Sequence, residues 1–358
     1  MELRRLRVGD LRIIGEAELD LAPRLNVIVG GNGAGKTSLL EAAFLLSHGR
    51  SFRSGSRDAL VRQGSAGFQV YGEVASRAGV RRVGLGRTPA GMEARVDGAT
   101  VGTGELVRNV AVLYFGPGSQ SLIAGAGEER RRFLDWGVFH VEHAFLGDWR
   151  RYQRSLKQRN ALLRSGQVGS ALDAWDLELE RNAVPLTAAR QAYVDAWVPL
   201  LGEELAALLP ELGKPAVRFS AGYDPDRPLS EVLRSRREQD AARGHTGTGP
   251  HRADWSLSFE GSLRREHFSR GQEKLCALAC VIAQARLFAE RAGEWPILGL
   301  DDVGSEVDAE HRGRVFAQLD GGAGQVLATA TALSEWGSAC ATPERVFHVE
   351  HGRLGALV

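Results

Sequence analysis

The stretch of sequence that decides the fold is Val27-Ile28-Val29-Gly30-Gly31-Asn32-Gly33-Ala34-Gly35-Lys36-Thr37-Ser38. It fits the pattern G-x-x-x-x-G-K-[ST], which follows an apolar strand and opens a helix in phosphate-binding loops. Its glycines let backbone N–H groups turn inward as a cradle for an anion, with the positive end of the next helix behind them. The stretch therefore predicts a nucleotide-binding loop, whereas a turn that only reverses the chain would not need the lysine.

Single positions of this loop have separate expected roles. Lys36 would reach the β- and γ-phosphates of ATP, and the Thr37 hydroxyl would hold Mg²⁺. Lysine is rare in this chain, which has only four, so Lys36 stands out among the arginines. A compact ammonium suits a tight phosphate loop better than a guanidinium fork does. The other expected nucleotide contacts in the loop are Gly30, Gly31, Asn32, Gly33, Ala34, Gly35 and Ser38.

The composition is that of a globular protein. The 358 residues are 43% apolar and 25% charged, which allows one large or two ordinary domains with a sizeable core. No apolar run is long enough to cross a membrane, and the first residues lack the apolar segment of a secretory signal, so we expect a cytosolic protein. Because 45 basic residues face 44 acidic ones, any basic surface for nucleic acid must be local.

Hydrophobic periodicity predicts an α/β fold. Residues 25–29 form a continuous apolar run, typical of a buried parallel strand, and the phosphate loop follows its C-terminal end, where open sheets bind ligands. Residues 3–21 read as short strands, and residues 67–101 alternate with period two, which predicts an antiparallel sheet adjoining the parallel core sheet. Another apolar strand is expected at residues 110–115.

A helical insertion interrupts this pattern. Apolar residues recur every three or four positions from residue 128 to 163 and again from 172 to 205, so we expect two long antiparallel helices. Pro185 and Pro199 should kink or split the second helix. The expected domains are an ATPase head at 1–127 and 213–358, and a helical arm at 128–212.

Two groups of arginines are candidates for DNA contacts. One lies in the loop after the phosphate-loop helix, and the other lies on the first long helix, where Trp149 and Tyr152 are expected in the core. Each group is either a solvated surface or a set of phosphate contacts, and acidic neighbours dilute the charge of the second. The candidate DNA contacts in the loop are Arg53 and Arg57. Those on the helix are Arg131, Arg150 and Arg154, within a basic surface that also includes Arg130, Arg132, Arg151, Lys157, Arg159 and Arg164.

Two further stretches carry chemistry. Ser269-Arg270-Gly271-Gln272 forms a capping box before an apolar helix, and a capped helix start with Ser and Gly is also an anion site. Cys276 and Cys280 lie on that helix and are expected to be core residues. The apolar strand at 296–300 ends in Asp301, expected to hold Mg²⁺, and Asp302, which would position or deprotonate the attacking water.

These stretches, in this order, resemble the nucleotide-binding heads of the ABC and SMC-like ATPase superfamily, including a following loop at 304–308. Within it the chain is similar to the bacterial RecF family of DNA repair proteins. This similarity is carried by residues 25–42 and by two further runs, Glu129-Arg130-Arg131-Arg132-Phe133-Leu134-Asp135 and Thr248-Gly249-Pro250-His251-Arg252. The resemblance implies an ABC-type ATPase head with an inserted helical lobe.

The resemblance also implies a mechanism. ATP would lie between the phosphate loop of one protomer and Ser269 to Gln272 of another, so that ATP joins a homodimer and hydrolysis separates it. Gln120 would be the glutamine that senses Mg²⁺. The family further implies binding to gapped or junction DNA, help in loading the recombinase, and RecO and RecR as partners.

The chain departs from ABC heads at two places. Asp302 stands where a glutamate is usual, and no histidine occurs in the late strand at 325–331, so we expect a slow ATPase that depends on DNA. Residues His251 and Arg252 are either a polar turn or part of a site. Two other classes stay open: an ABC transporter subunit, which usually has a shorter insertion, and an SMC-type tether, which has a long heptad arm.

Overall fold

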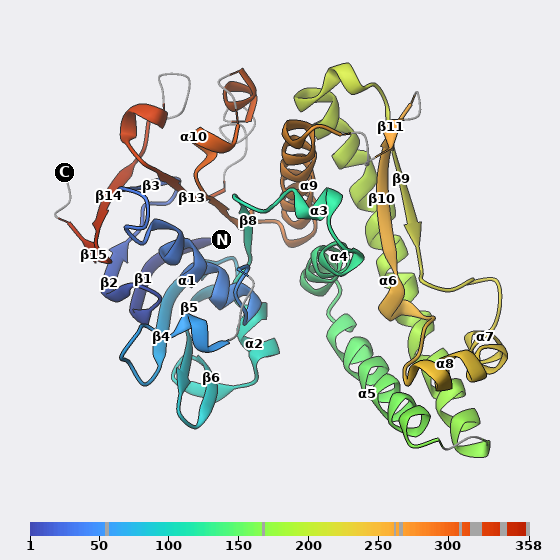
Figure 1. The fold of residues 1–358 in the computed structure, drawn as a ribbon. Coiled ribbons are helices and arrows are strands. Elements are labelled where there is room, and N and C mark those ends of the chain that lie inside the picture. Colours follow the sequence, from blue (N-terminus) through green and yellow to red (C-terminus); the bar gives the residue numbers. More distant parts are fainter. Residues whose placement is uncertain are drawn as a thin grey trace. The chain divides into compact units, whose positions relative to one another are not determined.

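The computed structural model describes residues 1–53, 57–166, 169–260, 263–264, 268–307, 310–315, 324–336 and 342–355. The chain divides into two compact units (Figure 1). The first unit, called the head here, contains Met1–Ser119 and Lys274–Val358, and the second, called the helical unit, contains Gln120–Glu273. Each unit is described by itself.

The first sheet of the head has a parallel core, as predicted. Its strand order is β15-β14-β3-β13-β12-β8, and all pairs are parallel except β14 with β15. Strands β3, β12 and β13 are buried along their whole length, which explains why their sequences are continuous apolar runs without alternation. The bounds are β3 (Leu25–Val29), β8 (Val112–Phe115), β12 (Ile297–Leu300), β13 (Val326–Ala330), β14 (Arg345–Glu350) and β15 (Arg353–Leu354).

The second sheet of the head is antiparallel and includes the first strands of the chain. Its order is β2-β1-β4-β5-β6-β7, so residues 3–21 and 67–101 share one sheet. Alternating burial along these strands shows that one face packs on a core and the other faces solvent. The bounds are β1 (Glu2–Leu11), β2 (Ile14–Asp20), β4 (Phe68–Ser76), β5 (Gly79–Thr88), β6 (Gly91–Val96) and β7 (Ala99–Val101).

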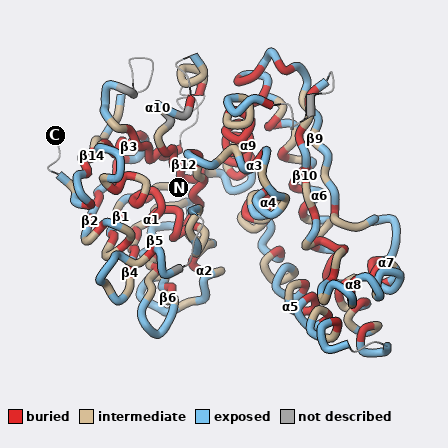
Figure 2. Tube along the Cα trace, in the orientation of Figure 1, coloured by how far each residue is buried: buried red, intermediate tan, exposed pale blue. Residues whose placement is uncertain are grey.

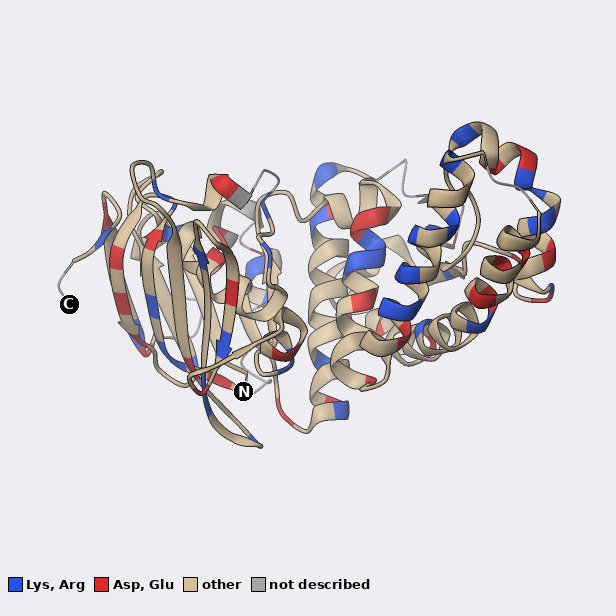
Figure 3. Ribbon diagram, turned by 90° about the horizontal axis from the view of Figure 1, so that it is seen from below, with Lys and Arg blue, Asp and Glu red and all other residues tan. Residues whose placement is uncertain are grey.

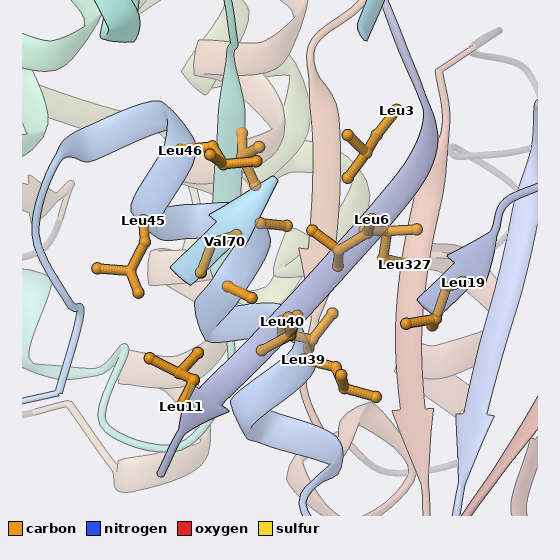
Figure 4. Close-up of a cluster of buried hydrophobic side chains, with 14 of the residues drawn as sticks. Leu3, Leu6, Leu11, Leu19, Leu39, Leu40, Leu45, Leu46, Val70 and Leu327 are labelled. Carbon is orange, nitrogen blue, oxygen red and sulfur yellow. The ribbon is translucent and has the colours of Figure 1, made fainter. Parts of the chain in front are cut away.

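Helix α1 (Lys36–His48) contributes to the core that joins the two sheets. Leu39 and Leu40 of this helix belong to one buried cluster with Leu6 of β1, Val70 of β4 and Leu327 of β13 (Figure 4). Within the head, Figure 2 shows buried residues (red) along α1 and β3. Because α1 begins at the phosphate loop, this apolar packing fixes the loop on the head. Other short elements are η1 (Arg57–Leu60), α2 (Thr103–Arg108), α10 (Val303–Glu306) and η5 (Leu333–Trp336).

Helix α9 (Arg270–Ala292) begins in the last residues of the helical unit and continues in the head. Cys276 and Cys280 are fully buried on it, which confirms that they are core residues. Burial raises the pKa of the Cys280 thiol well above its ordinary value, because a thiolate would lose its hydration there. No helix in the described part of the chain is long and apolar enough to cross a membrane.

The helical unit contains one more break than the sequence predicts. The first long helix ends at Val141 and a new one begins at Phe145, because Glu142 has an extended backbone. The second is one continuous helix of 39 residues that is not split by Pro185 and Pro199. The bounds are α3 (Ser121–Ala124), α4 (Gly127–Val141), α5 (Phe145–Arg164), α6 (Ser170–Leu208), η2 (Pro210–Leu212), α7 (Leu229–Ser235), α8 (Arg237–Arg243) and η3 (Pro250–Arg252).

Residues 213–273 belong with the helices, which differs from the expected return to the head at 213. They supply the sheet β11-β10-β9, formed by β9 (Pro215–Ser220), β10 (Asp254–Phe259) and β11 (Leu263–Arg264). The physical reason is aromatic packing: Trp255 of β10 meets Trp197 of α6 with ring centroids 5.1 Å apart and Phe133 of α4 at 6.2 Å. Strand alternation alone does not tell which unit a strand joins.

Buried ion pairs also hold the helical unit together, and they correct the predicted basic helix surface. Arg130 pairs with Asp254 at 2.7 Å and is 2% exposed. Arg159 is fully buried and pairs with Asp176 at 2.6 Å and Asp240 at 2.8 Å. Neither arginine is therefore available to a ligand. The expectation for Trp149 is also wrong, because its side chain is 36% exposed, whereas Tyr152 is buried as predicted.

His251 has a structural role in the same unit. Its Nε2 lies 2.9 Å from the carbonyl oxygen of Thr246, which can only accept, so Nε2 carries the proton. Its Nδ1 then accepts a hydrogen bond of 2.7 Å from the Tyr152 hydroxyl. This arrangement needs a neutral imidazole, and burial lowers the pKa of His251 from 6.5 to about 4. The run from Thr248 to Arg252 is thus tied to α5 through a neutral histidine.

We expect stability to fall with acidification because of His251. Between pH 6.5 and 4 the unfolded chain binds a proton that the folded His251 does not, so the contribution is fully present above pH 6.5 and is lost as the pH falls through this window. The loss between pH 7 and pH 5 is about 2 kcal/mol in the free energy of unfolding. Urea unfolding at the two pH values should show a smaller difference in His251→Gln than in the unaltered protein.

The exposed residue His348 on β14 gives a matched control, since His348→Gln should keep the full pH dependence. An equal pH dependence in His251→Gln and the unaltered protein would contradict the assignment of a neutral folded-state imidazole.

Candidate nucleotide-binding site

The phosphate loop has the backbone that its sequence predicts. Gly33 and Gly35 have φ values of 76° and 116°, which side chains disfavour, and Gly35 is the N-terminal cap of α1. A Cβ on Gly35 would also come within 2.7 Å of Ile14 Cδ1. The Lys36 ammonium donates to the carbonyl oxygens of Gly30 at 2.7 Å and Gly31 at 3.1 Å, so its charge is held over the loop.

Asp301 lies at the C-terminal end of β12 and is 2% exposed. Its Oδ1 accepts hydrogen bonds from the Thr37 hydroxyl at 3.1 Å and the Thr329 hydroxyl at 2.7 Å, and its Oδ2 accepts one from the Tyr114 hydroxyl at 3.1 Å. The phosphate loop and strands β8, β12 and β13 therefore meet at this carboxylate. The predicted metal-binding pair of Thr37 and Asp301 is in direct contact.

Asp302 has an unusual backbone, and one of its carboxylate oxygens has no hydrogen-bond partner among the described residues. Its φ is 54°, in the left-handed region, and its N–H donates to Thr329 Oγ1 at 2.9 Å. Its Oδ2 accepts from the Ser305 hydroxyl at 2.6 Å, whereas Oδ1 is buried and has no hydrogen-bond partner among the described residues. A buried carboxylate oxygen with no partner is available to accept a proton or bind a water molecule.

A pocket of about 440 Å³ opens over the loop. Besides residues 33–38 it is lined by Arg12 and Ile13, at the turn between β1 and β2, and by Arg53. Arg12 makes two hydrogen bonds to the fully buried Glu41, of 2.9 and 2.7 Å, and a third to the carbonyl of Ala59. The pocket thus has a fixed basic wall.

Several residues of this site cannot be found from local motifs. Thr329, Tyr114, Arg12 and Glu41 lie far from the phosphate loop in sequence or carry no pattern of their own. A partial signal exists for Thr329 and Tyr114, since both lie near the C-terminal ends of strands in a parallel sheet, where ligands bind. Gly116 makes room for one contact, because a Cβ there would come within 2.5 Å of the Tyr114 hydroxyl.

The donors present fit Mg²⁺. No cluster of three or more His, Cys, Asp or Glu side chains that could hold a metal occurs within the described part of the chain. Mg²⁺ sites in nucleotide-binding proteins do not need such a cage, because phosphates and water fill most positions. The Thr37 hydroxyl and the Asp301 carboxylate supply the hard oxygen ligands that this ion prefers.

The capping box is formed as predicted. The Ser269 N–H donates to Gln272 Oε1 at 2.9 Å and the Gln272 N–H donates to Ser269 Oγ at 3.2 Å. Ser269, Arg270 and Gly271 are exposed. This segment belongs to the helical unit and the phosphate loop belongs to the head, so its role at a nucleotide stays a prediction. Gln120 precedes α3, and its Oε1 is buried without a partner among the described residues.

The candidate DNA contacts differ in their surroundings. Arg150 and Arg154 are exposed on α5 and form no ion pair with a described residue. Arg131 donates to the carbonyl of Ala253 at 2.8 Å, and burial lowers its pKa. Arg53 lies 3.8 Å from Glu41 and lines the pocket over the phosphate loop. The side chain of Arg57 lies outside what the structure describes, as does Asp308 of the predicted loop after the acidic strand.

Comparison with known proteins agrees with this geometry. A family described as AAA domain matches residues 5–88. The DNA replication and repair protein RecF of Stenotrophomonas maltophilia is 45% identical over the whole of both chains, and that of Stutzerimonas stutzeri is 40% identical over 100% of this chain and 98% of its own. A solved structure of the recombination mediator RecF-ATP superposes with a TM-score of 0.89 and 26% identity over 99% of this chain and 97% of its own.

A more distant likeness defines the fold class. The Smc head domain of Pyrococcus furiosus superposes with a TM-score of 0.60 at 14% identity, over 99% of this chain and 95% of its own. The fold and the phosphate loop together define an ATP-binding head of the ABC and SMC-like ATPase class. Within this class, the chain belongs to the RecF family of DNA replication and repair proteins.

We expect Thr329 to position Asp301 for metal binding. Thr329→Val keeps the shape of the side chain but removes the donor to Asp301 and the acceptor for the Asp302 N–H. The Mg²⁺ concentration needed for half-maximal binding of a fluorescent ATP analogue should rise about tenfold or more. The free energy of unfolding should fall by about 1–3 kcal/mol, because the buried Asp301 carboxylate loses a donor.

The exposed Thr88 on β5 provides a control, since Thr88→Val should leave the Mg²⁺ titration unchanged. A folded Thr329→Val protein with the Mg²⁺ dependence of the unaltered chain would show that Thr329 does not position Asp301.

Proposed function

We propose that this protein is an ATP-switched DNA-binding protein of recombinational repair and replication restart. ATP and Mg²⁺ bind at residues 30–38 with Asp301, and ATP then joins two copies of the chain. The dimer holds gapped or junction DNA and helps to load recombinase, and hydrolysis releases it. The observation that carries this proposal is the contact of Thr37 with Asp301 beneath a preformed phosphate loop, in a member of the RecF family.

The exposed capping box supports the dimerisation step. Ser269 and Gln272 satisfy each other, which leaves the first N–H groups of α9 and the Ser269 hydroxyl at an exposed helix start. An exposed helix N-terminus stabilises a bound phosphate. We therefore assign Ser269, Arg270, Gly271 and Gln272 to the ATP bound by the phosphate loop of a second copy, with Gln120 as a metal-sensing residue.

The geometry of Asp302 supports slow hydrolysis. Its Oδ1, which has no partner among the described residues, suits a base, but the side chain is held by Ser305 and is one methylene shorter than a glutamate. A base must come within hydrogen-bond reach of the water it activates, so a shorter side chain lowers the rate unless the water moves closer. We propose that Asp302 is the base, that Lys36 stabilises the leaving phosphates, and that DNA binding increases the rate.

A stripe of cations on α5 supports DNA binding. Arg150, Arg154, Lys157 and Arg164 follow one another at spacings that place them on one face of the helix, and all four are exposed. None of the four forms an ion pair with a described residue, and residues 149–164 contain no acidic side chain. Elsewhere basic and acidic residues are interspersed over both units (Figure 3). We propose that this α5 stripe contacts DNA phosphates, together with Arg53, Arg57 and Arg131.

The other parts of the proposal rest on the family. The solved relative is described as a mediator in the RecFOR pathway, and on that ground we propose RecO and RecR as partners and the cytoplasm as location. A transporter subunit is not favoured, because the relatives that match over the whole chain are DNA repair proteins. The Smc head domain shares the fold, but it superposes on this chain with a lower TM-score than the RecF-ATP structure does.

We expect ATP to convert the monomer into a dimer, which sedimentation velocity measures directly. Lys36→Met should abolish dimerisation because it removes the charge that meets the phosphates, and Ser269→Arg should abolish it by filling the exposed helix start. ATP binding should be lost only in Lys36→Met. If ATP fails to dimerise the unaltered protein, or if Ser269→Arg dimerises normally, ATP does not lie between the phosphate loop of one copy and Ser269 of the other.

We expect the α5 stripe to set the salt dependence of DNA binding. Replacing Arg150, Arg154 and Lys157 together by glutamine should weaken binding to a gapped duplex and reduce the slope of log Kobs against log salt by about 3, since each phosphate contact releases about one counterion. Fluorescence anisotropy between low and moderate salt measures this slope. Arg181→Gln on α6, also exposed, is the matched control, and an unchanged slope in the triple variant would place the DNA elsewhere.

A further inference from the structure

A groove lies between the C-terminal third of α6 and β9 in the helical unit. Its volume is about 660 Å³. Most of its lining is apolar or small: Val198, Pro199, Gly202 and Ala206 on α6, and Pro215 and Val217 on β9. Glu203 of α6 and Lys214, just before β9, are the charged residues of the lining. Gly202 keeps it open, since a Cβ added there would have Pro215 Cγ, at 4.0 Å, as its nearest neighbour. The nucleotide site and the α5 stripe use none of these residues.

One wall of the groove is an unpaired strand edge. β9 is the terminal strand of the order β11-β10-β9, and no described strand pairs with its far side. The Glu260 N–H donates to the Lys214 carbonyl at 3.0 Å, so the backbone of Lys214 points toward β10. Ala216 and Arg218 follow at intervals of two residues and pair with Ser258 and Ser256 of β10, so their backbone groups point the same way. Backbone groups alternate in direction along an antiparallel strand, so those of Val217 and Phe219 point to the free edge.

The side chains of β9 also alternate. Pro215, Val217 and Phe219 are half-buried, whereas Ala216 and Arg218 are exposed. Lys214, just before the strand, and Arg218 form no ion pair with a described residue. The strand thus offers backbone donors and acceptors on its edge, a mostly apolar groove on one face, and the cation Arg218 on the other, whereas Lys214 lines the groove.

We propose that the β9 edge binds an extended segment of a partner protein in which apolar and acidic residues alternate. The segment adds to the sheet as a fourth strand, through hydrogen bonds to the backbone of Val217 and Phe219. Because side chains alternate with period two, its apolar residues enter the groove against α6. Its acidic residues then lie on the face of Arg218, where opposite charges on neighbouring strands attract.

The alternation distinguishes this occupant from a helix. A helix satisfies its own backbone and would leave the edge groups of β9 unpaired, whereas a strand pairs them. A basic segment would place a like charge beside Arg218, which is unfavourable across neighbouring strands. The proposal is independent of ATP, because every residue it uses belongs to the helical unit.

A fluorescein-labelled peptide of eight residues, alternating glutamate with valine or leucine, tests the proposal on the full chain without nucleotide. Fluorescence anisotropy should show saturable binding, weakened about tenfold by Gly202→Leu, which fills the groove, and little changed by Gly202→Ala. Arg218→Glu should weaken binding severalfold, and the exposed Arg227→Glu should not. A peptide with methylated amides along the edge that faces β9 should not bind, because it lacks the donors.

Three results would overturn the proposal: no saturable binding, equal binding of a peptide with lysine in place of glutamate, or full binding to Gly202→Leu. Urea unfolding of each variant separates loss of binding from loss of fold. Sedimentation without peptide tests the other occupant, because a concentration-dependent dimer that Gly202→Leu abolishes would assign the groove to a second copy of the chain. Failure of these tests would leave ATP-driven dimerisation and DNA binding untouched.

Discussion

The hydrogen bonds at the Asp301 carboxylate are the interaction on which the head depends. Thr37, Thr329 and Tyr114 reach it from the phosphate loop, β13 and β8, so that three segments far apart in the sequence are fixed at one point. Because the carboxylate is 2% exposed, these donors compensate for its lost hydration. A ligand that binds the Asp301 carboxylate therefore affects all three segments together.

The helical unit depends on a different principle, in which buried arginines join elements that apolar packing alone would leave free to slide. Arg159 on α5 reaches Asp176 on α6 and Asp240 on α8, and Arg190 on α6 reaches Asp135 on α4 and the carbonyl of Pro250. Each of these hydrogen bonds forms only when the two helices are in one position along their axes, so the bonds fix how the helices are aligned. Buried ion pairs add little net stability over apolar residues, but breaking one leaves a charge without compensation.

The sequence was sufficient where a pattern is local. The strand, glycine-rich loop and helix at residues 25–48, the capping box at Ser269 and the buried strand before Asp301 each depend on residues close in sequence, and each has the local structure that the sequence predicts. The contacts of Thr329 and Tyr114 with Asp301 could not be predicted, because they depend on which strands are neighbours. Arg130 and Arg159 were misassigned to the surface for the same reason: their acidic partners, Asp254, Asp176 and Asp240, lie 17 to 124 positions away.

The fully buried Arg159 also has a consequence for behaviour on heating. Hydration of charged groups becomes less favourable as temperature rises, so the desolvation penalty of the ions at Arg159, Asp176 and Asp240 becomes smaller. The stabilisation from burying apolar surface does not increase in the same way at high temperature. The junction of α5, α6 and α8 therefore loses less of its stability at high temperature than a purely apolar junction of the same size would lose.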